Sequence, residues 1–325
     1  MKSKGYWGSV WSRFKKNKFA LAGLYCVAVL FGLAVFAPLI ANDKPYIYID
    51  DKVYFPILFD YSELQGADLR KEEFGGFKLF PPIRYSPSEY DLDFVVLPPS
   101  RAHILGTDEQ GRDLASRMIH GARVSIFIGF IAVFIYVAIG IVVGAAAGYY
   151  GGVTDIVVSR IIEIVMCFPT FFLILTILAL WGPSLASVMF VIGITGWTGI
   201  ARIVRGEFMR LRESDYVAAA RAAGAGDFLI IFKHILPNAL SPVLVSATFG
   251  IAATILVESS LSFLGFGVQP PTPSWGDILS QSRDFMDFAW WLTIIPGLAI
   301  FVTITSYNLV GEGLQEAMDP KSAGK

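Results

Sequence analysis

Charge is scarce in this sequence. Only 16% of its 325 residues are Asp, Glu, Lys or Arg, whereas about 25% is usual in soluble domains. Lys and Arg number 26 and Asp and Glu number 27, so the chain has none of the net basic character by which proteins attract nucleic acid. Hydrophobic residues make up 54%. This composition excludes a disordered chain and argues against a water-soluble enzyme, and we expect no nucleic-acid partner.

Residues and motifs that carry chemistry are also rare. Cys26 and Cys167 both lie in apolar runs, which argues against a disulfide-stapled domain and predicts buried, inert thiols. His103, His120 and His234 are far apart, without metal-ligand spacing. The sequence also lacks G-x-x-x-x-G-K-[ST], H-E-x-x-H and G-x-S-x-G. We therefore expect no catalytic residues, no metal site and no ATP site in this chain.

What the sequence has in abundance is long apolar runs. Charged residues are missing from five segments, namely 19–42, 124–154, 164–201, 235–257 and 288–311. A membrane-spanning helix needs about 20 apolar residues, and each run is long enough. A tight turn at 181–184 (Trp-Gly-Pro-Ser) divides the longest run. The sequence thus predicts an all-α membrane protein with six spans: 19–41, 124–148, 156–180, 184–201, 239–264 and 289–312.

The distribution of Lys and Arg predicts the orientation of these spans. The segment 1–18 is basic and contains no acid, and the apolar run that follows is too long for the core of a signal peptide. The predicted loop 202–238 is also rich in Lys and Arg, whereas the loop 265–288 carries only Arg283. Because basic loops stay in the cytoplasm, we expect both termini and the loop 202–238 to be cytoplasmic.

The one large polar segment, 42–123, then lies on the extracytoplasmic side of the membrane. Its first part is rich in proline and aromatic residues, and the stretches 46–49 and 53–59 predict two short strands around a turn at 50–52. The insertion could be a structural cap over the spans or a docking surface for an extracytoplasmic partner. The predicted organisation is 1–41 for the N-terminus and first span, 42–101 for the insertion, 102–312 for the core and 313–325 for the tail.

The cytoplasmic loop 202–238 contains a distinctive short helix. Ser214 and Asp215 form a favourable helix start, an Ala-rich stretch follows, and Gly224 stands where a left-handed residue ends a helix. A second helix is expected from Asp227 to residue 236, where Pro237 should stop it. An Ala-rich helix can approach another backbone closely, or its alanines can simply reflect helix propensity.

Arg160, Glu163 and Glu258 fall within the predicted spans, where charge is costly. Arg160 and Glu163 are three positions apart on one helical face, so they can form a structural ion pair, or they can line a pathway. Glu258 stands near Ser259 and Ser262, and it can either line a pathway or hydrogen-bond a neighbouring helix. Outside the spans, the stretch 106–113 can cap a helix through Thr107, Asp108 and Gly111.

The cytoplasmic loop resembles that of ATP-binding cassette importer permeases. The resemblance rests on Ala219 and Ala220, three further residues, Gly224, and then the pair Leu236 and Pro237. The family often has an acid before the two alanines, where this chain has Ala218.

Several further motifs, in order along residues 103–312, resemble one branch of that family, the dipeptide, oligopeptide and nickel permeases. They are Gly106-Thr107-Asp108-Glu-Gln-Gly111-Arg112-Asp113, Gly148-Tyr-Tyr-Gly-Gly152, Glu258 to Gly267, and Pro273-Ser-Trp-Gly276. The stretches 41–45 and 54–58 resemble the subgroup that imports oligopeptides and microcin C.

The resemblance implies a type I ABC importer permease fold in the bacterial inner membrane. It implies a second permease subunit, two cytoplasmic ATPase domains that hold the ATP and Mg²⁺, and an extracytoplasmic substrate-binding protein. The ATPase-coupling residues would be Asp215, Ala219, Ala220, Gly224, Leu236 and Pro237. For Gly106 to Asp113, the residues leave open whether the motif also touches the binding protein or gates the cavity. The alternative is an ion-coupled transporter that uses Arg160, Glu163 and Glu258. It is weakened by the few internal charges and by the absence of visibly broken paired helices.

Overall fold

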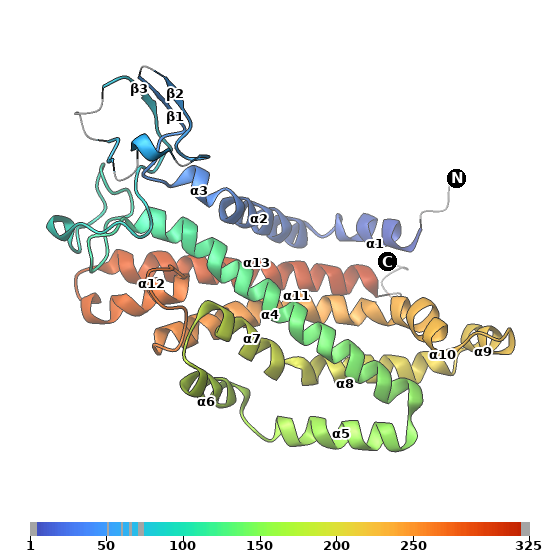
Figure 1. Cartoon of the computed structure of the whole chain (residues 1–325). Helices are drawn as coiled ribbons and strands as arrows, with labels where there is room; N and C mark the ends of the chain where they lie inside the picture. The colour runs from blue at the N-terminus through green and yellow to red at the C-terminus, as the bar shows by residue number, and fades with distance from the viewer. Residues whose placement is uncertain (1–4, 51, 60, 65–66, 71–74, 320–325) are drawn as a thin grey trace. The chain divides into compact units, whose positions relative to one another are not determined.

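A computed structural model describes residues 5–50, 52–59, 61–64, 67–70 and 75–319, which are mostly helical (Figure 1). Among these described residues, five helical segments are long and apolar enough to cross a membrane, and there are six when one bent helix pair counts as a single span. The predicted all-α membrane protein with six spans is thereby confirmed. The N-terminal Lys2 and Lys4, the turn residue Asp51 and the tail 320–325 lie outside the described residues.

The helices follow one another along the chain (Figure 1). They are α1 (Tyr6–Phe14), α2 (Lys18–Val35), α3 (Ala37–Ile40), α4 (Leu114–Tyr150), α5 (Gly152–Met166), α6 (Thr170–Trp181), α7 (Leu185–Thr195), α8 (Trp197–Arg212), α9 (Asp215–Ala222), α10 (Asp227–Leu229), the π-helical η3 (Ile230–Ile235), α11 (Leu236–Phe263), α12 (Trp275–Gln281) and α13 (Trp290–Met318). Short 3₁₀ turns are η1 (Ser62–Leu64), η2 (Leu92–Phe94) and η4 (Ser282–Phe285). The strands are β1 (Ile47–Ile49), β2 (Val53–Tyr54) and β3 (Phe77–Leu79).

The chain folds into two compact units, which we describe separately. The first comprises residues 1–27, 128–257 and 303–325, and the second comprises 28–127 and 258–302. The cytoplasmic loop predicted from the sequence belongs to the first unit. The insertion and the motif at 106–113 belong to the second.

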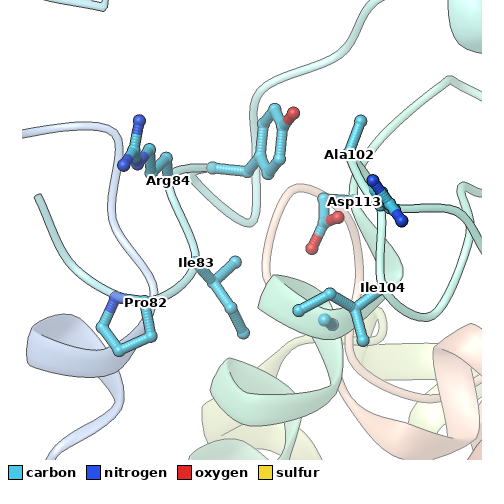
Figure 2. Close-up of a pocket in the computed structure, with 9 residues that line it drawn as sticks. Pro82, Ile83, Arg84, Ala102, Ile104 and Asp113 are labelled. Carbon is cyan, nitrogen blue, oxygen red and sulfur yellow. The ribbon is translucent and has the colours of Figure 1, made fainter.

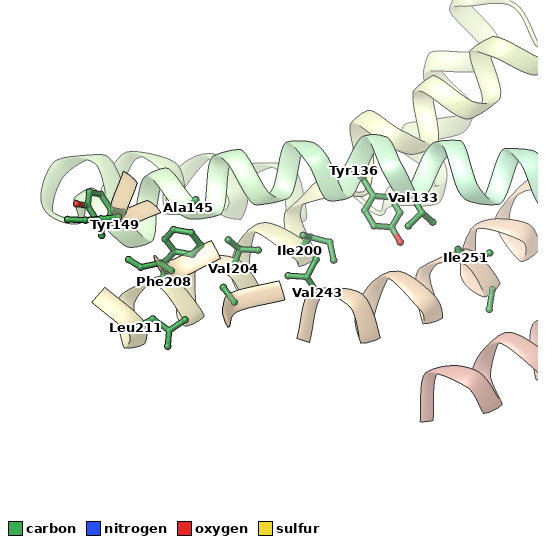
Figure 3. Packing of buried hydrophobic residues seen from close by; sticks show 14 of the residues in the cluster. Val133, Tyr136, Ala145, Tyr149, Ile200, Val204, Phe208, Leu211, Val243 and Ile251 are labelled. Atoms are coloured by element: carbon green, nitrogen blue, oxygen red, sulfur yellow. The ribbon is translucent and has the colours of Figure 1, made fainter. Parts of the chain in front are cut away.

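The core of the first unit lies between α4, α8 and α11. Figure 3 shows Tyr149 and Ala145 of α4 facing Phe208 and Val204 of α8, and the cluster continues along α11. Phe208 and Val204 are fully buried. Because α8 carries its apolar residues on one face and its arginines on the other, it packs here as an amphipathic helix.

Glycines bring α4 and α8 into backbone contact. Gly140, Gly144 and Gly148 recur at every fourth position, so they lie on one face of α4. A Cβ atom added at Gly140 would lie 2.6 Å from the Cβ of Ile200, and one at Gly148 would lie 2.6 Å from the carbonyl oxygen of Arg205. This is the small-residue packing that lets membrane helices approach closely.

The third predicted span, 156–180, is not one straight helix. α5 and α6 meet at Pro169 with a bend of 79°. This predicted span is therefore broken into two helices. Proline lacks the N–H that would continue the helix and constrains the residue before it, and Gly182 with a φ of +83° then ends α6. Cys167 lies at this bend and is exposed, so the prediction of a buried thiol was wrong for it.

The second unit holds a three-stranded antiparallel sheet in the order β2-β1-β3. Tyr48 pairs with Tyr54, and Ile47 pairs with Leu79. The two predicted strands are confirmed, although β2 stops at Tyr54, shortly before Pro56, which can donate no ladder hydrogen bond. The third strand, β3, was not predicted.

Candidate functional site

The short Ala-rich helix of the cytoplasmic loop forms as α9. Ser214 occupies the N-cap position, but its Oγ donates to the carbonyl of Leu211 at 2.5 Å and caps no α9 amide. Gly224 has a φ of +84°, which is the left-handed conformation predicted for it. The N–H of Gly224 donates to the carbonyl of Arg221 and that of Ala225 donates to the carbonyl of Ala220, at 3.0 and 3.1 Å. These bonds close the C-terminus of α9 in a tight corner.

One face of α9 is anchored and the other is free. Val217 is fully buried in the core of the first unit, whereas Ala219 is exposed and Ala220 half-buried. Tyr216 is 41% exposed. The alanines thus present a surface with little side chain, held in place by a single buried residue.

The sequence predicted that the helix would stop at Pro237, but the helix continues through this residue. Residues 227–263 form one continuous helical segment, in which the π-helical η3 leads directly into α11. The amide of Leu236 donates to the carbonyl of Ile231, one π turn earlier in the chain. The wider π turn leaves room for the ring of Pro237, and Asn238 Nδ2 donates to the carbonyl of His234 at 2.8 Å.

An apolar patch lies beside the corner at Gly224. It consists of Phe228, Leu229 and Phe232, which are 75%, 44% and 52% exposed. The two phenylalanine rings are 4.5 Å apart. On the opposite side of this segment, Ile230 and Ile235 are fully buried. A patch of this kind indicates an interaction site. We call α9, the corner and this patch, residues 215–237, the coupling segment, after the role that the sequence resemblance implies for it.

The end of α4 holds the coupling segment at two points, just before α9 and at Asp227. Tyr149 Oη donates to Asp227 Oδ1 at 2.6 Å. Arg212, at the end of α8, donates to the carbonyl oxygens of Gly148 and Tyr149 at 3.3 and 3.2 Å. The segment is therefore fixed to the first unit before the exposed alanines and again between them and the apolar patch.

Arg160 and Glu163 form the ion pair that their spacing allowed. Their side chains lie 2.5 Å apart and are 73% and 59% exposed. Asp155, on the same helix, pairs with Arg205 of α8. The second pair ties α5 to α8, and the first makes no such tie.

The motif at 106–113 forms the centre of a buried charge cluster in the second unit. Asp108 accepts from Arg112 Nε at 2.7 Å and from Arg117 Nη1 at 2.5 Å. Arg117 also donates to Asp277 of α12 at 2.6 Å, and Gln281 donates to the same carboxylate at 3.2 Å. Asp108, Arg112 and Arg117 are all at most 3% exposed. The cluster joins the start of α4 to α12, two segments that lie far apart in the sequence.

The helix that follows the motif is capped by Asp113, so the prediction that Thr107, Asp108 and Gly111 cap it was wrong. Asp113 Oδ1 accepts from the amide of Ser116 at 2.7 Å, in the first turn of α4. Helix α4 thus begins at Leu114, well before position 124, where the span was predicted to start. Thr107 Oγ1 instead donates to the carbonyl of Phe94 and accepts from the amide of Leu97 in a loop.

A cavity of about 260 Å³ opens beside Asp113 (Figure 2). Arg84, Ile83 and Ile104 are among its lining residues. The second carboxylate oxygen of Asp113 lies 2.9 Å from Nδ1 of His103. Burial raises the pKa of Asp113, and the hydrogen bonds from Ser116 and His103 oppose the shift. Burial likewise raises the pKa of Asp277, against the effect of Arg117.

Glu258 hydrogen-bonds to its surroundings in the second unit and is fully buried. Its carboxylate accepts from Ser262 and Ser274 at 2.8 Å and from Ser125 of α4 at 3.4 Å. The sequence left two roles open for Glu258, to line a pathway or to hydrogen-bond a neighbouring helix, and the structure shows the hydrogen bond. Ser274 Oγ also caps α12 through the amide of Asp277.

Sequence reasoning missed Asp277 and the recurring glycines of α4. Asp277 follows the quoted stretch 273–276, but nothing local indicates that it pairs with Arg117. The glycine spacing was visible in the sequence, and the regular recurrence of Gly140, Gly144 and Gly148 could have predicted a tight helix contact.

Comparison with known protein families shows that this chain is similar to membrane components of transport systems. Residues 140–323 match the family described as binding-protein-dependent transport system inner membrane component. Residues 5–59 match the N-terminal transmembrane domain of oligopeptide transport permease C.

Three curated relatives illustrate the sequence similarity. A dipeptide transport system permease from Alkalihalophilus pseudofirmus is 36% identical over 97% of this chain and 90% of its own length. A di/tripeptide permease from Pseudomonas aeruginosa is 36% identical over 96% of this chain and 91% of its own. A glutathione permease from Pectobacterium atrosepticum is 40% identical over 71% of this chain and 77% of its own.

Solved structures share the fold. Two inward-facing structures of the MetNI methionine ABC transporter match with TM-scores of 0.50 and 0.51, at 20% and 19% identity. They cover 62% and 63% of this chain and 95% and 98% of the matched chains. The type I importer permease fold expected from the sequence is therefore confirmed.

Proposed function

Because the chain belongs to the family of inner membrane components of binding-protein-dependent transport systems, we propose that it is the permease subunit through which an ATP-driven importer takes up peptides. The observation that carries this proposal is the coupling segment, whose exposed alanines and apolar patch surround a left-handed glycine. An ion-coupled transporter needs no such surface, and family membership favours the ATP-driven importer.

Peptides are the proposed substrate class because of the relatives' names. The curated relatives described above are named for dipeptides, for di- and tripeptides and for glutathione, itself a tripeptide. The narrower likeness to microcin C importers remains a prediction from the stretches 41–45 and 54–58. The permease would form half of the translocation pathway, and a second permease subunit would form the other half.

We assign ATP hydrolysis to partner subunits. The sequence has no phosphate-binding loop of the G-x-x-x-x-G-K-[ST] type, so ATP and Mg²⁺ would bind to two cytoplasmic ATPase domains. The coupling segment would dock into a groove on one of them. Its alanines allow close approach, while Phe228 and Phe232 supply apolar area for the contact. An extracytoplasmic binding protein would deliver the peptide to the opposite side.

The proposed topology places both termini and the coupling segment in the cytoplasm. It rests on the excess of Lys and Arg in the segment 1–18 and in the loop 202–238. The charge cluster around Arg117 then lies on the extracytoplasmic side, where the binding protein would dock. A cysteine-reactive probe that does not cross membranes tests this orientation in intact cells. It should label Leu92→Cys from the extracytoplasmic side and should not label Phe228→Cys.

Two glycines within the coupling segment provide a matched pair for testing the coupling. Both Gly224 and Gly226 have open space where a Cβ atom would be, but only Gly224 has a positive φ, while Gly226 has a φ of −74°. We expect Gly224→Leu to remain in the membrane and to lose ATP-driven peptide uptake. Gly226→Leu should retain uptake, because its backbone suits any residue.

The first experiment is purification of the chain from its own membranes in mild detergent, with partners identified by mass spectrometry. The proposal expects a second permease and an ATPase in near-stoichiometric amounts. A chain that purifies alone, or a Gly224→Leu variant with normal uptake, would contradict it.

A further inference from the structure

The N-terminal helix α1 has two different faces. Val10 and Phe14 are only 6% and 4% exposed, whereas Tyr6, Trp7 and Trp11 are 55%, 54% and 47% exposed. These three large aromatic side chains lie at the surface of a short helix, and Tyr6 and Trp7 also border an open cavity of about 1000 Å³ beside α8 and α11. We call Tyr6, Trp7 and Trp11 the aromatic face of α1.

The buried face fixes α1 against the rest of the first unit. Val10 and Phe14 pack with Ala20 of α2 and Ala317 of α13. Tyr6 Oη lies 3.1 Å from Ser241 Oγ on α11. The aromatic face therefore points in a fixed direction and does not turn with a freely rotating helix.

The link to α2 is equally defined. Asn17 Oδ1 accepts from the amide of Ala20, and Asn17 Nδ2 donates to Glu316 of α13 at 2.9 Å. Only residues 15–17 separate α1 from α2, which is a candidate membrane span beginning at Lys18. A link of this length reaches at most about 11 Å, so α1 must lie close to the membrane boundary.

Positive charge surrounds the aromatic face. Arg13, Lys15, Lys16 and Lys18 lie at the end of α1 and the start of α2, and the segment 1–42 contains no Asp or Glu. The Lys15 ammonium lies 4.9 Å from the ring centre of Trp11. Aromatic rings with polar tips favour the membrane interface, and adjacent basic residues favour anionic lipid.

We propose that α1 lies in the interface of the cytoplasmic leaflet and binds anionic lipid headgroups. The aromatic face enters the boundary between headgroups and acyl chains, as in interfacial amphipathic helices. The ammonium groups of Lys15 and Lys16, with the guanidinium of Arg13, contact phosphate groups. The occupant is lipid rather than a soluble protein, because the short link to α2 keeps this face at the bilayer and its charge matches that of anionic lipids. The choice of leaflet rests on the topology given under the proposed function.

Nitroxide labels on the full chain test the proposal without requiring transport. Single cysteines replace Trp7, Trp11 and, as an aqueous control, Leu92, in a chain that carries Cys26→Ser and Cys167→Ser. Leu92 is 76% exposed in the extracytoplasmic segment. The chain is placed in phosphatidylcholine vesicles with or without about 30 mol% phosphatidylglycerol. Electron paramagnetic resonance then compares collisions of each label with oxygen, which partitions into lipid, and with a water-soluble nickel complex.

We expect the oxygen-to-nickel collision ratio at positions 7 and 11 to exceed that at position 92 by about threefold or more. Phosphatidylglycerol should raise the ratio further, and Lys15→Gln together with Lys16→Gln should remove this increase. Equal ratios at positions 7, 11 and 92 would show that α1 faces water and would overturn the proposal. High ratios that do not respond to phosphatidylglycerol would overturn the anionic-lipid specificity. Neither result depends on uptake, so a failure of the importer function would be recognised separately.

Discussion

Replacing Arg117 with methionine tests the buried charge cluster most directly. Methionine keeps much of the volume but removes the guanidinium that joins Asp108 to Asp277. Asp108 retains Arg112 at 2.7 Å, whereas Asp277, whose side chain is 10% exposed, retains Gln281 at 3.2 Å. The uncompensated charge therefore falls mainly on Asp277.

The expected loss in the free energy of unfolding is large for a single substitution. Removing one partner of a buried ion pair costs about 3–5 kcal/mol. For a domain of about 150–250 residues each kcal/mol lowers Tm by about 2–4 °C, so Arg117→Met should lower Tm by roughly 10 °C. Adding Asp277→Asn removes the stranded charge and should restore at least half of that loss.

The assay is a thermal melt of the detergent-solubilised chain, followed by the loss of its monodisperse chromatographic peak. The control is Lys52→Met in the same unit, which breaks an exposed pair with Glu63 at 3.9 Å and should leave Tm unchanged. If Arg117→Met melts no earlier than Lys52→Met, or if Asp277→Asn makes the double variant worse, the cluster is not the tie between these segments that we infer.

Three further predictions concern other contacts. Gly148→Ala should destabilise the chain by about 1–3 kcal/mol because its Cβ atom meets the α8 backbone, whereas Gly199→Ala, with open space around it, should be neutral or stabilising in the same melt. Tyr149→Phe removes the hydrogen bond to Asp227 and should lower peptide uptake per ATP hydrolysed while the chain stays folded, as measured in proteoliposomes. Burial raises the pKa of Asp113 above 3.8, so the folded chain retains a proton that the unfolded chain releases; stability should fall as pH rises from about 3.8 through the raised pKa, and Asp113→Asn should flatten this part of the pH profile.

The number of spans could be predicted from the sequence because it depends on hydropathy, which is a local property. The continuity of each span could not. Pro169 breaks its helix, whereas Pro242 and Pro296 lie inside α11 and α13 without ending them. Neighbouring helices can satisfy the carbonyl groups that a proline leaves free, so the outcome at each proline depends on packing that the local sequence does not contain.

In the candidate site, too, some features could be predicted from the local sequence and others could not. The corner at Gly224 was predictable because a left-handed residue after a helix is a requirement of local backbone geometry. The π turns before Pro237 and the pairing of Arg117 with Asp277 were not predictable. The first depends on the fit of one helix against its neighbours, and the second joins residues from distant parts of the sequence, which only the folded chain brings together.

The glycines of α4 have a consequence for how force passes through the first unit. Ile200, Val204 and Phe208 of α8 occupy the spaces above Gly140, Gly144 and Gly148, so the two helices are engaged at regular steps. One such step corresponds to about 6 Å along a helix, and any smaller slip would drive a side chain into backbone. Because α8 leads directly into α9, a displacement of the coupling segment by less than one helical turn must move α4 together with α8.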